Sequence, residues 1–222
     1  MSDHPYVLAH LLAPVNRRAA DALGLPCRLP TATGVALTFD DGPHPEGTPA
    51  VLEVLARAGA PATFFVIGEQ VRRRPGLVAE IAAAGHGIGL HGFQHRLQAR
   101  LPPAVVRDDV RRGVAAIEDA IGATPVLHRP PFGIYSPAGL AAVRAAGMRP
   151  LLWSRWGKDW RRRTTPRRIA GRVLAGVLPG DVILLHDADF YSAHNSHRRT
   201  AAALAPILRE LDRRRVGTVL AV

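Results

Sequence analysis

Cysteine is almost absent from this sequence, because Cys27 is the only one among its 222 residues. An intramolecular disulfide and a cysteine-based metal cluster are therefore excluded, and the composition fits a reducing compartment. Long hydrophobic runs are also missing. The apolar stretch at residues 6–15 is short, contains Pro14, and has its basic residues after it. It is therefore not typical of a signal peptide or a membrane-spanning helix, and we expect a cytoplasmic protein.

Acidic residues are scarce as well: 18 Asp and Glu stand against 29 Lys and Arg, a formal net charge of +11. Such an excess favours anionic partners, although an arginine-rich composition produces it without any binding role. The sequence has no recognition helix, zinc-finger spacing or interleaved basic and aromatic residues, so we expect no nucleic-acid partner. Peripheral association with an acidic membrane surface stays open. The oligomeric state cannot be inferred.

The N-terminal residues suggest a small extension ahead of the main domain. Leu8, Leu11, Leu12 and Val15 share one helical face, which predicts a short amphipathic helix. We place this extension at residues 1–33 and a single catalytic domain at residues 34–222.

From residue 34 onward, short apolar runs alternate with segments of helical periodicity. The apolar runs occupy residues 35–39, 62–67, 87–91, 125–129, 150–153, 182–186 and 219–222. No linker separates these units. About seven strand–helix units in succession predict an α/β fold with a parallel sheet that closes into a (β/α) barrel.

Reactive side chains lie at the ends of these apolar runs. Asp40 and Asp41 follow the first run, His91 ends the third, Arg129 ends the fourth and His186 ends the sixth. In (β/α) barrels the chemistry sits on the loops after the strands, at their C-terminal ends. The pattern therefore predicts one catalytic site at that end of the barrel.

The first run ends in two adjacent carboxylates, which Gly42-Pro43 follows immediately. Side chains alternate along a strand, so we expect Asp40 and Asp41 to point in different directions. One carboxylate can then bind a metal while the other takes a proton. Taken alone, the stretch is equally compatible with a solvated turn.

Two imidazoles, His91 and His95, stand four residues apart, a spacing that lets both bind one ion from a single helical turn. Together with a carboxylate from a neighbouring strand they predict a three-ligand site with open positions for water, which is the catalytic kind. A divalent ion there would acidify water and polarise a carbonyl, so hydrolysis of an amide or ester is indicated.

Five motifs in this order, TFDDGP, HGFQH, RPPFG, DW and ILLH, resemble those of the polysaccharide deacetylase family. This is the nodulation-factor deacetylase homology domain of the fourth carbohydrate esterase family. The resemblance runs from about Val35 to Val222. It implies a distorted (β/α) barrel that removes acetyl groups from N-acetylated sugars with one divalent ion, zinc by preference and cobalt or nickel as alternatives.

The resemblance also implies the roles of the proton-transfer and metal residues. Asp40 resembles the general base, and Asp41, His91 and His95 resemble the metal ligands. Arg129 would hold Asp40 ionised by a charge-assisted hydrogen bond.

The remaining roles concern the leaving group and the acetyl group. His186 would protonate the departing amine, with Asp159 raising its pKa. The backbone N–H near Phe132 would stabilise the oxyanion. Trp160 and Ile183 would form the slot for the acetyl methyl.

The sequence departs from the family pattern at two positions. Gly92 follows the first metal histidine where Ser or Thr is usual, and Trp156 stands where relatives often have Asp. If Gly92 removes a supporting hydroxyl, Gly92→Ser is expected to tighten metal binding, unless another group fills that role or the backbone requires glycine.

The sequence therefore predicts a metal-dependent deacetylase of an N-acetylated amino sugar. Two alternatives stay open: a related barrel hydrolase that acts on another amide or an O-acetyl ester, and a carbohydrate-binding barrel with weak catalysis. The basic residues Arg155 and Arg161–Arg163 could hold a phosphate, which favours a small, lipid-linked or nucleotide-linked glycoside over an insoluble polymer.

Overall fold

The computed structural model describes residue 20, residues 23–30 and residues 33–221. The expected amphipathic helix with Leu8, Leu11, Leu12 and Val15 lies outside these residues. Residues 23–30 pack on the main domain, where Pro26 O accepts a hydrogen bond from Leu152 N (2.8 Å) and Leu29 N donates to Gly180 O (2.8 Å). The boundary at residue 33 stays a prediction.

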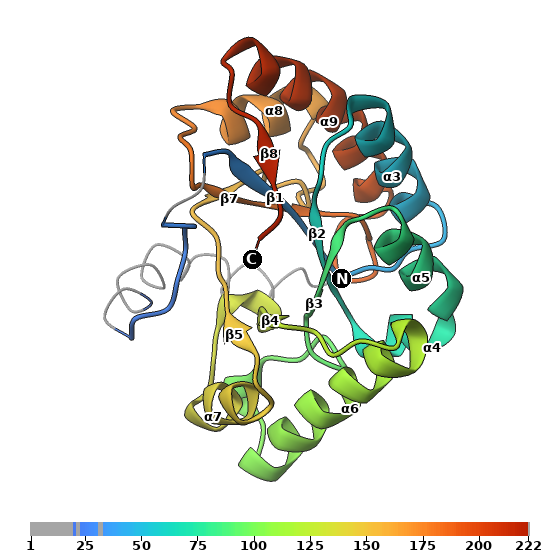
Figure 1. Ribbon diagram of the computed structural model, residues 1–222, viewed down its shortest axis with the longest axis vertical. Helices are drawn as coiled ribbons and strands as arrows, with labels where there is room; N and C mark the ends of the chain where they lie inside the picture. The colour runs from blue at the N-terminus through green and yellow to red at the C-terminus, as the bar shows by residue number, and fades with distance from the viewer. Residues whose placement is uncertain (1–19, 21–22, 31–32, 222) are drawn as a thin grey trace.

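A curled parallel sheet forms the centre of the domain (Figure 1). Its strands follow the order β5-β4-β3-β2-β1-β7-β6, and β8 pairs with β1. The strands are β1 (Val35–Asp40), β2 (Thr63–Val66), β3 (Gly87–Leu90), β4 (Leu127–His128), β5 (Arg149–Pro150), β6 (Arg155–Trp156), β7 (Val182–His186) and β8 (Thr218–Val219). Because β5 and β6 end this order without pairing, the barrel is distorted, and the predicted fold class is confirmed.

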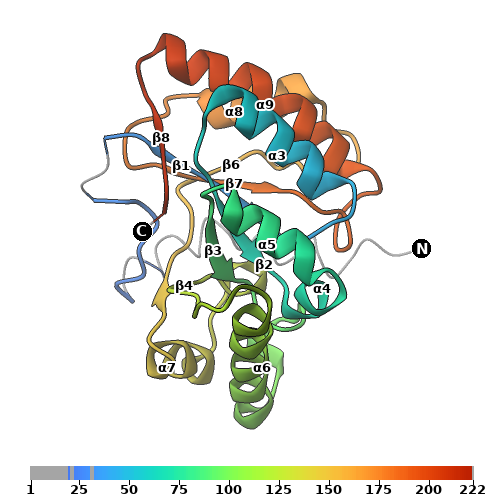
Figure 2. The ribbon, with the colours of Figure 1, turned by 45° about the vertical axis from the view of Figure 1, so that its right-hand side comes forward.

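Helices cover the outside of the curled sheet (Figures 1 and 2). They are α3 (Gly47–Ala58), α4 (Gly68–Arg73), α5 (Pro75–Ala83), α6 (Pro103–Ile121), α7 (Pro137–Ala145), α8 (Pro166–Leu174) and α9 (Ser196–Arg213), with 3-10 turns η1 (Gln98–Arg100) and η2 (Pro131–Gly133). Gly59 ends α3 in the left-handed conformation, which favours glycine. In the described residues no helix is long and apolar enough to cross a bilayer.

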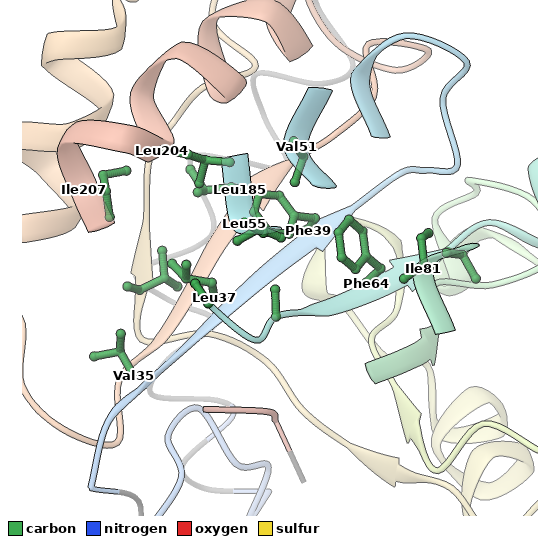
Figure 3. Close-up of a cluster of buried hydrophobic side chains, with 14 of the residues drawn as sticks. Val35, Leu37, Phe39, Val51, Leu55, Phe64, Ile81, Leu185, Leu204 and Ile207 are labelled. Carbon is green, nitrogen blue, oxygen red and sulfur yellow. The ribbon is translucent and has the colours of Figure 1, made fainter. Parts of the chain in front are cut away.

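The central strand β1 is buried on both faces, and its side chains alternate between two environments. Val35, Leu37 and Phe39 belong to the core between sheet and helices. Figure 3 shows them against residues of α3 and α9, and Phe39 stacks on Phe64 with ring centroids 5.0 Å apart. Thr38 and Asp40 take the other face, toward the barrel interior, so the strand's period of two delivers Asp40 to the barrel mouth.

Three local features differ from the sequence prediction. The structure adds α4 and the short strand β6, neither of which the apolar pattern indicated. Residues 91–97 form an irregular loop, so the prediction that His91 and His95 share a helical turn is wrong. Gly92 has φ 87°, which interrupts any helix between them.

Because Phe39 is fully buried, Phe39→Ala is expected to lower the free energy of unfolding by about 3–5 kcal/mol, through lost burial and the cavity it leaves. Chemical denaturation measures this value. Leu178→Ala, at a side chain that is 58% exposed, serves as the control and should change stability by less than about 0.5 kcal/mol. Equal midpoints for Phe39→Ala and the unmodified chain would contradict this description of the core.

Candidate active site

A small cleft opens at the C-terminal ends of the strands, where the sequence predicts the site. It brings together residues from all five motifs. Its lining consists of Asp40, Asp41, His91, His95, Phe132, Gly133, Trp153, Trp160, Leu184, His186, Tyr191 and Ser192. Strand register explains part of this grouping, because Asp40 and His186 are direct partners across β1 and β7.

Arg129 is fully buried and directs its guanidinium at Asp40. Nη1 donates to Asp40 Oδ1 at 2.7 Å and to Thr38 Oγ1 at 2.9 Å. Nε and Nη2 donate to the carbonyls of Leu151 and Leu152 at 3.0 and 2.9 Å. The side chain is thus held on three sides and fixes one oxygen of Asp40.

Burial and Arg129 act on the pKa of Asp40 in opposite directions. Burial raises the pKa of Asp40 above its ordinary value, although Arg129 acts in the opposite direction. Asp40 is therefore more basic than an exposed carboxylate. A raised pKa suits a general base that must accept a proton near neutral pH.

Asp41, His91 and His95 converge on one point. Asp41 Oδ1 lies 3.6 Å from His91 Nε2 and 3.4 Å from His95 Nε2. The φ of 79° at Asp41 takes it out of the strand, so both neighbouring carboxylates line the cleft instead of facing opposite sides.

These three groups fit a cation. His91 Nδ1 is 2.8 Å from Arg129 O, so it carries the proton and leaves a lone pair on Nε2. Burial lowers the pKa of His91 to about 3 and that of His95 well below its ordinary value, so both rings are neutral. Burial raises the pKa of Asp41 to about 7, and its Oδ1 has no hydrogen-bond partner. One carboxylate oxygen and two imidazole nitrogens this close to one another form a ligand set that a divalent cation fits.

The pKa of His186 is shifted in the opposite direction from those of His91 and His95. Burial disfavours its charged form, but Asp159, with Oδ1 2.9 Å from Nδ1, raises the pKa of His186 to about 10. Asp159 Oδ2 also accepts from His186 N (2.7 Å) and Thr200 Oγ1 (2.7 Å). His186 is therefore a protonated acid in the cleft wall, with Nε2 on the side away from Asp159.

Of the two residues expected to form the acetyl slot, Trp160 lines the cleft and Ile183 does not. Phe132, which has φ 62°, lies edge-on to His95, and Trp160 lies edge-on to His186. Ile183, however, packs in the core between sheet and helices, and Leu184 lines the cleft. The prediction of Ile183 is wrong by one residue, because only Leu184 shares a strand face with His186.

Sequence reasoning missed Tyr191 and Ser192. The Tyr191 ring stacks on His95, with centroids 4.3 Å apart and an interplanar angle of 13°. Their position in the loop after β7 was the available signal. His194 and His197, which follow in the same region of the sequence, do not line the cleft.

A second group of potential ligands, His44, Asp189 and His197, lies beneath that loop. His44 Nδ1 accepts hydrogen bonds from the N–H groups of Glu46 (3.2 Å) and Gly47 (2.9 Å). Its proton therefore resides on Nε2, 3.3 Å from Asp189 Oδ1, where it donates and cannot bind a metal. This group anchors the loop that carries Tyr191.

Residues 30–151 match the family model described as polysaccharide deacetylase. A chitooligosaccharide deacetylase of Bradyrhizobium sp. (strain ANU 289) is 43% identical over 154 residues, which cover 69% of this chain and 70% of that protein. A peptidoglycan-N-acetylglucosamine deacetylase of Bacillus cereus is 38% identical over 181 residues, covering 81% and 82%.

A solved structure extends the similarity to the fold. The crystal structure of the Bc1960 peptidoglycan N-acetylglucosamine deacetylase has a TM-score of 0.82 and 28% identity, and covers 91% of this chain and 94% of that one. The family model spans more than half of the chain. The matched residues include Asp40, Asp41, His91, His95 and Arg129. The chain therefore belongs to the polysaccharide deacetylase family.

Proposed function

We propose that this carbohydrate N-deacetylase removes the acetyl group from an N-acetylated amino sugar with one divalent ion held by Asp41, His91 and His95. The observation that carries the proposal is the unpartnered Asp41 Oδ1 between two neutral imidazole nitrogens. Zinc suits one carboxylate and two imidazoles, and we propose it as the native metal, with cobalt or nickel as substitutes. When bound, the ion supplies Lewis-acid polarisation of the amide carbonyl and a more acidic water.

The protein's own groups account for the proton transfers. Asp40, held through Oδ1 by Arg129, accepts the proton of the attacking water. The backbone amide near Phe132 stabilises the negative charge that develops on the carbonyl oxygen. As the C–N bond breaks, His186 donates its Nε2 proton to the sugar nitrogen, and acetate and the free amine leave.

The wall of the cleft sets the size of the acyl group. Leu184 and Trp160 face the cleft next to His186, where they form the apolar slot for a methyl group. A longer acyl chain requires these side chains to move, so acetyl is the group that fits best.

Two carboxylate variants separate base from ligand. Asp40→Asn is expected to retain the ion and lose about 10²–10⁴-fold in kcat, because the amide cannot accept the proton. Asp41→Asn should lose the ion itself. Metal analysis and acetate release from N-acetylglucosamine oligomers measure both. If Asp40→Asn loses the ion while Asp41→Asn keeps it, the two assignments are reversed.

Asp159 sets the alkaline limit of activity. His186 acts when protonated, and with a pKa of about 10 it stays protonated until the pH rises through that value. Asp159→Asn removes the charge that offsets burial, so the pKa of His186 falls and the alkaline limb of kcat moves to lower pH. Asp212→Asn, at an exposed acid, is the control. An unchanged limb in Asp159→Asn would remove His186 from the role of acid.

The identity of the glycan forms the finer part of the proposal. We favour a small, lipid-linked or nucleotide-linked glycoside, whose phosphate would meet the exposed arginines Arg161, Arg162 and Arg163 next to Trp160. Arg155 does not belong to this group. It is engaged with Asp181 Oδ2 (2.6 Å) and with the carbonyls of Ala175 and Gly176.

Salt dependence tests the arginine group. Rising salt should raise KM for a phosphorylated N-acetylated glycoside but not for a neutral one, because screening weakens exposed charge pairs. Replacing Arg161, Arg162 and Arg163 by Gln should abolish that dependence. The matched triple change at Arg57, Arg209 and Arg215, which line a different groove, should retain it. A preference for neutral chito-oligomers without any salt effect contradicts the phosphate proposal.

The location in the cell belongs to the same proposal. Lipid-linked and nucleotide-linked sugars are anions, and a chain of net charge +11 is suited to them and to an acidic membrane surface. We therefore propose a cytoplasmic enzyme that associates peripherally with the membrane. Fractionation of the native cells tests this: the protein should leave the membrane fraction in high salt, and recovery from the extracellular medium would contradict it.

A further inference from the structure

The three residues between the two metal-binding histidines hold no regular structure of their own. Residues 92–94 belong to the loop after β3, so their backbone groups need partners elsewhere. The carbonyls of Gly92 and Phe93 accept hydrogen bonds from the N–H groups of Gly68 (3.0 Å) and Glu69 (2.9 Å), which begin α4. The first turn of α4 thus satisfies two of the three carbonyls, and Gln94 O accepts from Arg96 N at 2.8 Å.

The donors of the same loop meet a single carboxylate from α6. Asp109 Oδ2 accepts from Phe93 N at 2.8 Å, and Oδ1 accepts from Gln94 N at 3.1 Å. Asp109 is only 8% exposed. The nearest cation is Arg96, whose Nη2 lies 3.6 Å from Oδ1. Two consecutive amides of the loop therefore depend on one side chain.

Packing fixes the distance between the loop and both helices. The Phe93 ring is buried, with the Arg112 guanidinium 3.9 Å and the Arg72 guanidinium 5.0 Å from its centroid. Gly68 permits the close approach of α4, because a Cβ there would lie 2.6 Å from Phe93 Cδ2. The loop is therefore clamped between α4 and α6, and Asp109 supplies the carboxylate that accepts its backbone N–H groups.

Gly92 completes the arrangement. Its φ of 87° is one that a residue with a side chain rarely adopts, and a Cβ there would lie 3.1 Å from Asp109 Oδ2 and 3.2 Å from Gln94 O. The space beside Gly92 is thus already occupied by the carboxylate. We therefore expect Gly92→Ser to weaken metal binding, which reverses the expectation from the sequence.

We propose that Asp109 is a positioning residue for the metal site: it holds the loop at the separation that lets His91 and His95 bind one ion. Gly92 has no hydroxyl with which to support the site, and Asp109 supplies that support from α6. This inference rests on the proposed metal-dependent function. Without Asp109, the N–H groups of Phe93 and Gln94 lose their acceptor and the loop can relax away from its present path.

Metal affinity measured by competition with a chelator tests the proposal directly. Asp109→Ala is expected to bind Zn²⁺ and Co²⁺ about 10–100-fold more weakly than the unmodified chain, the range typical of groups that orient metal ligands. Asp109→Asn, which keeps one acceptor oxygen, should fall between the two. Gly92→Ser should also bind more weakly.

The control is Asp119→Ala, at another acidic residue of α6. Asp119 is exposed and lies ten residues further along the helix, so its loss should leave affinity unchanged. The absorption spectrum of bound Co²⁺ reports ligand geometry, and it should change in the Asp109 variants but not in Asp119→Ala. Thermal unfolding without metal identifies any variant that does not fold, and Asp109→Asn then decides the question.

The outcomes separate this inference from the function on which it rests. An unmodified chain that binds no divalent ion refutes the metal-dependent function and this inference with it. Metal binding by the unmodified chain that Asp109→Ala and Asp109→Asn match within twofold, with the same Co²⁺ spectrum, refutes the role of Asp109 alone.

Discussion

The hydrogen bond between the buried guanidinium of Arg129 and Asp40 Oδ1 is the interaction on which the cleft depends. Arg129 lies within 4.0 Å of the centre of the Phe65 ring and has no exposure to solvent. A buried charge of this kind persists only where its donors are met, and removal of one partner of such a pair costs about 3–5 kcal/mol. Here the partners come from β1 and from residues 151–152, so one side chain joins strands that are distant in the sheet order.

That interaction also places the two adjacent carboxylates in different surroundings. Asp40 is committed to Arg129, whereas Asp41, which leaves the strand at a positive φ, faces the imidazoles of His91 and His95. The Arg129 carbonyl, in turn, fixes the tautomer of His91. The proposed base and the proposed ligands are therefore coupled through a single residue of the third motif, which explains how neighbours in sequence acquire different surroundings.

Much of this arrangement was predictable, because strand ends carry a recognisable signal. The polar residues Asp40, His91, Arg129 and His186 each end an apolar run, and a parallel sheet brings those ends to one edge. The choice between Ile183 and Leu184 failed because it depends on which face of β7 meets the cleft. A continuous run of apolar residues gives no alternation from which to infer that face.

Other features could not be predicted because they depend on contacts between distant segments. Asp109 lies 14 residues after His95 in an exposed-looking acidic pair, and only the packing of α6 brings it to the histidine loop. The tautomer of His44, which excludes a second metal site, likewise depends on two backbone N–H groups at the start of α3. Tyr191 reaches His95 through a loop whose path the anchoring of Asp189 determines.

Anomalous diffraction from a crystal grown with zinc tests the central claim most directly. The account predicts one peak in contact with Asp41, His91 and His95, with Asp40 still hydrogen-bonded to Arg129, and no peak at His44, Asp189 and His197. A peak bound by Asp40 in place of Asp41, or one at the second group of histidines, would contradict it.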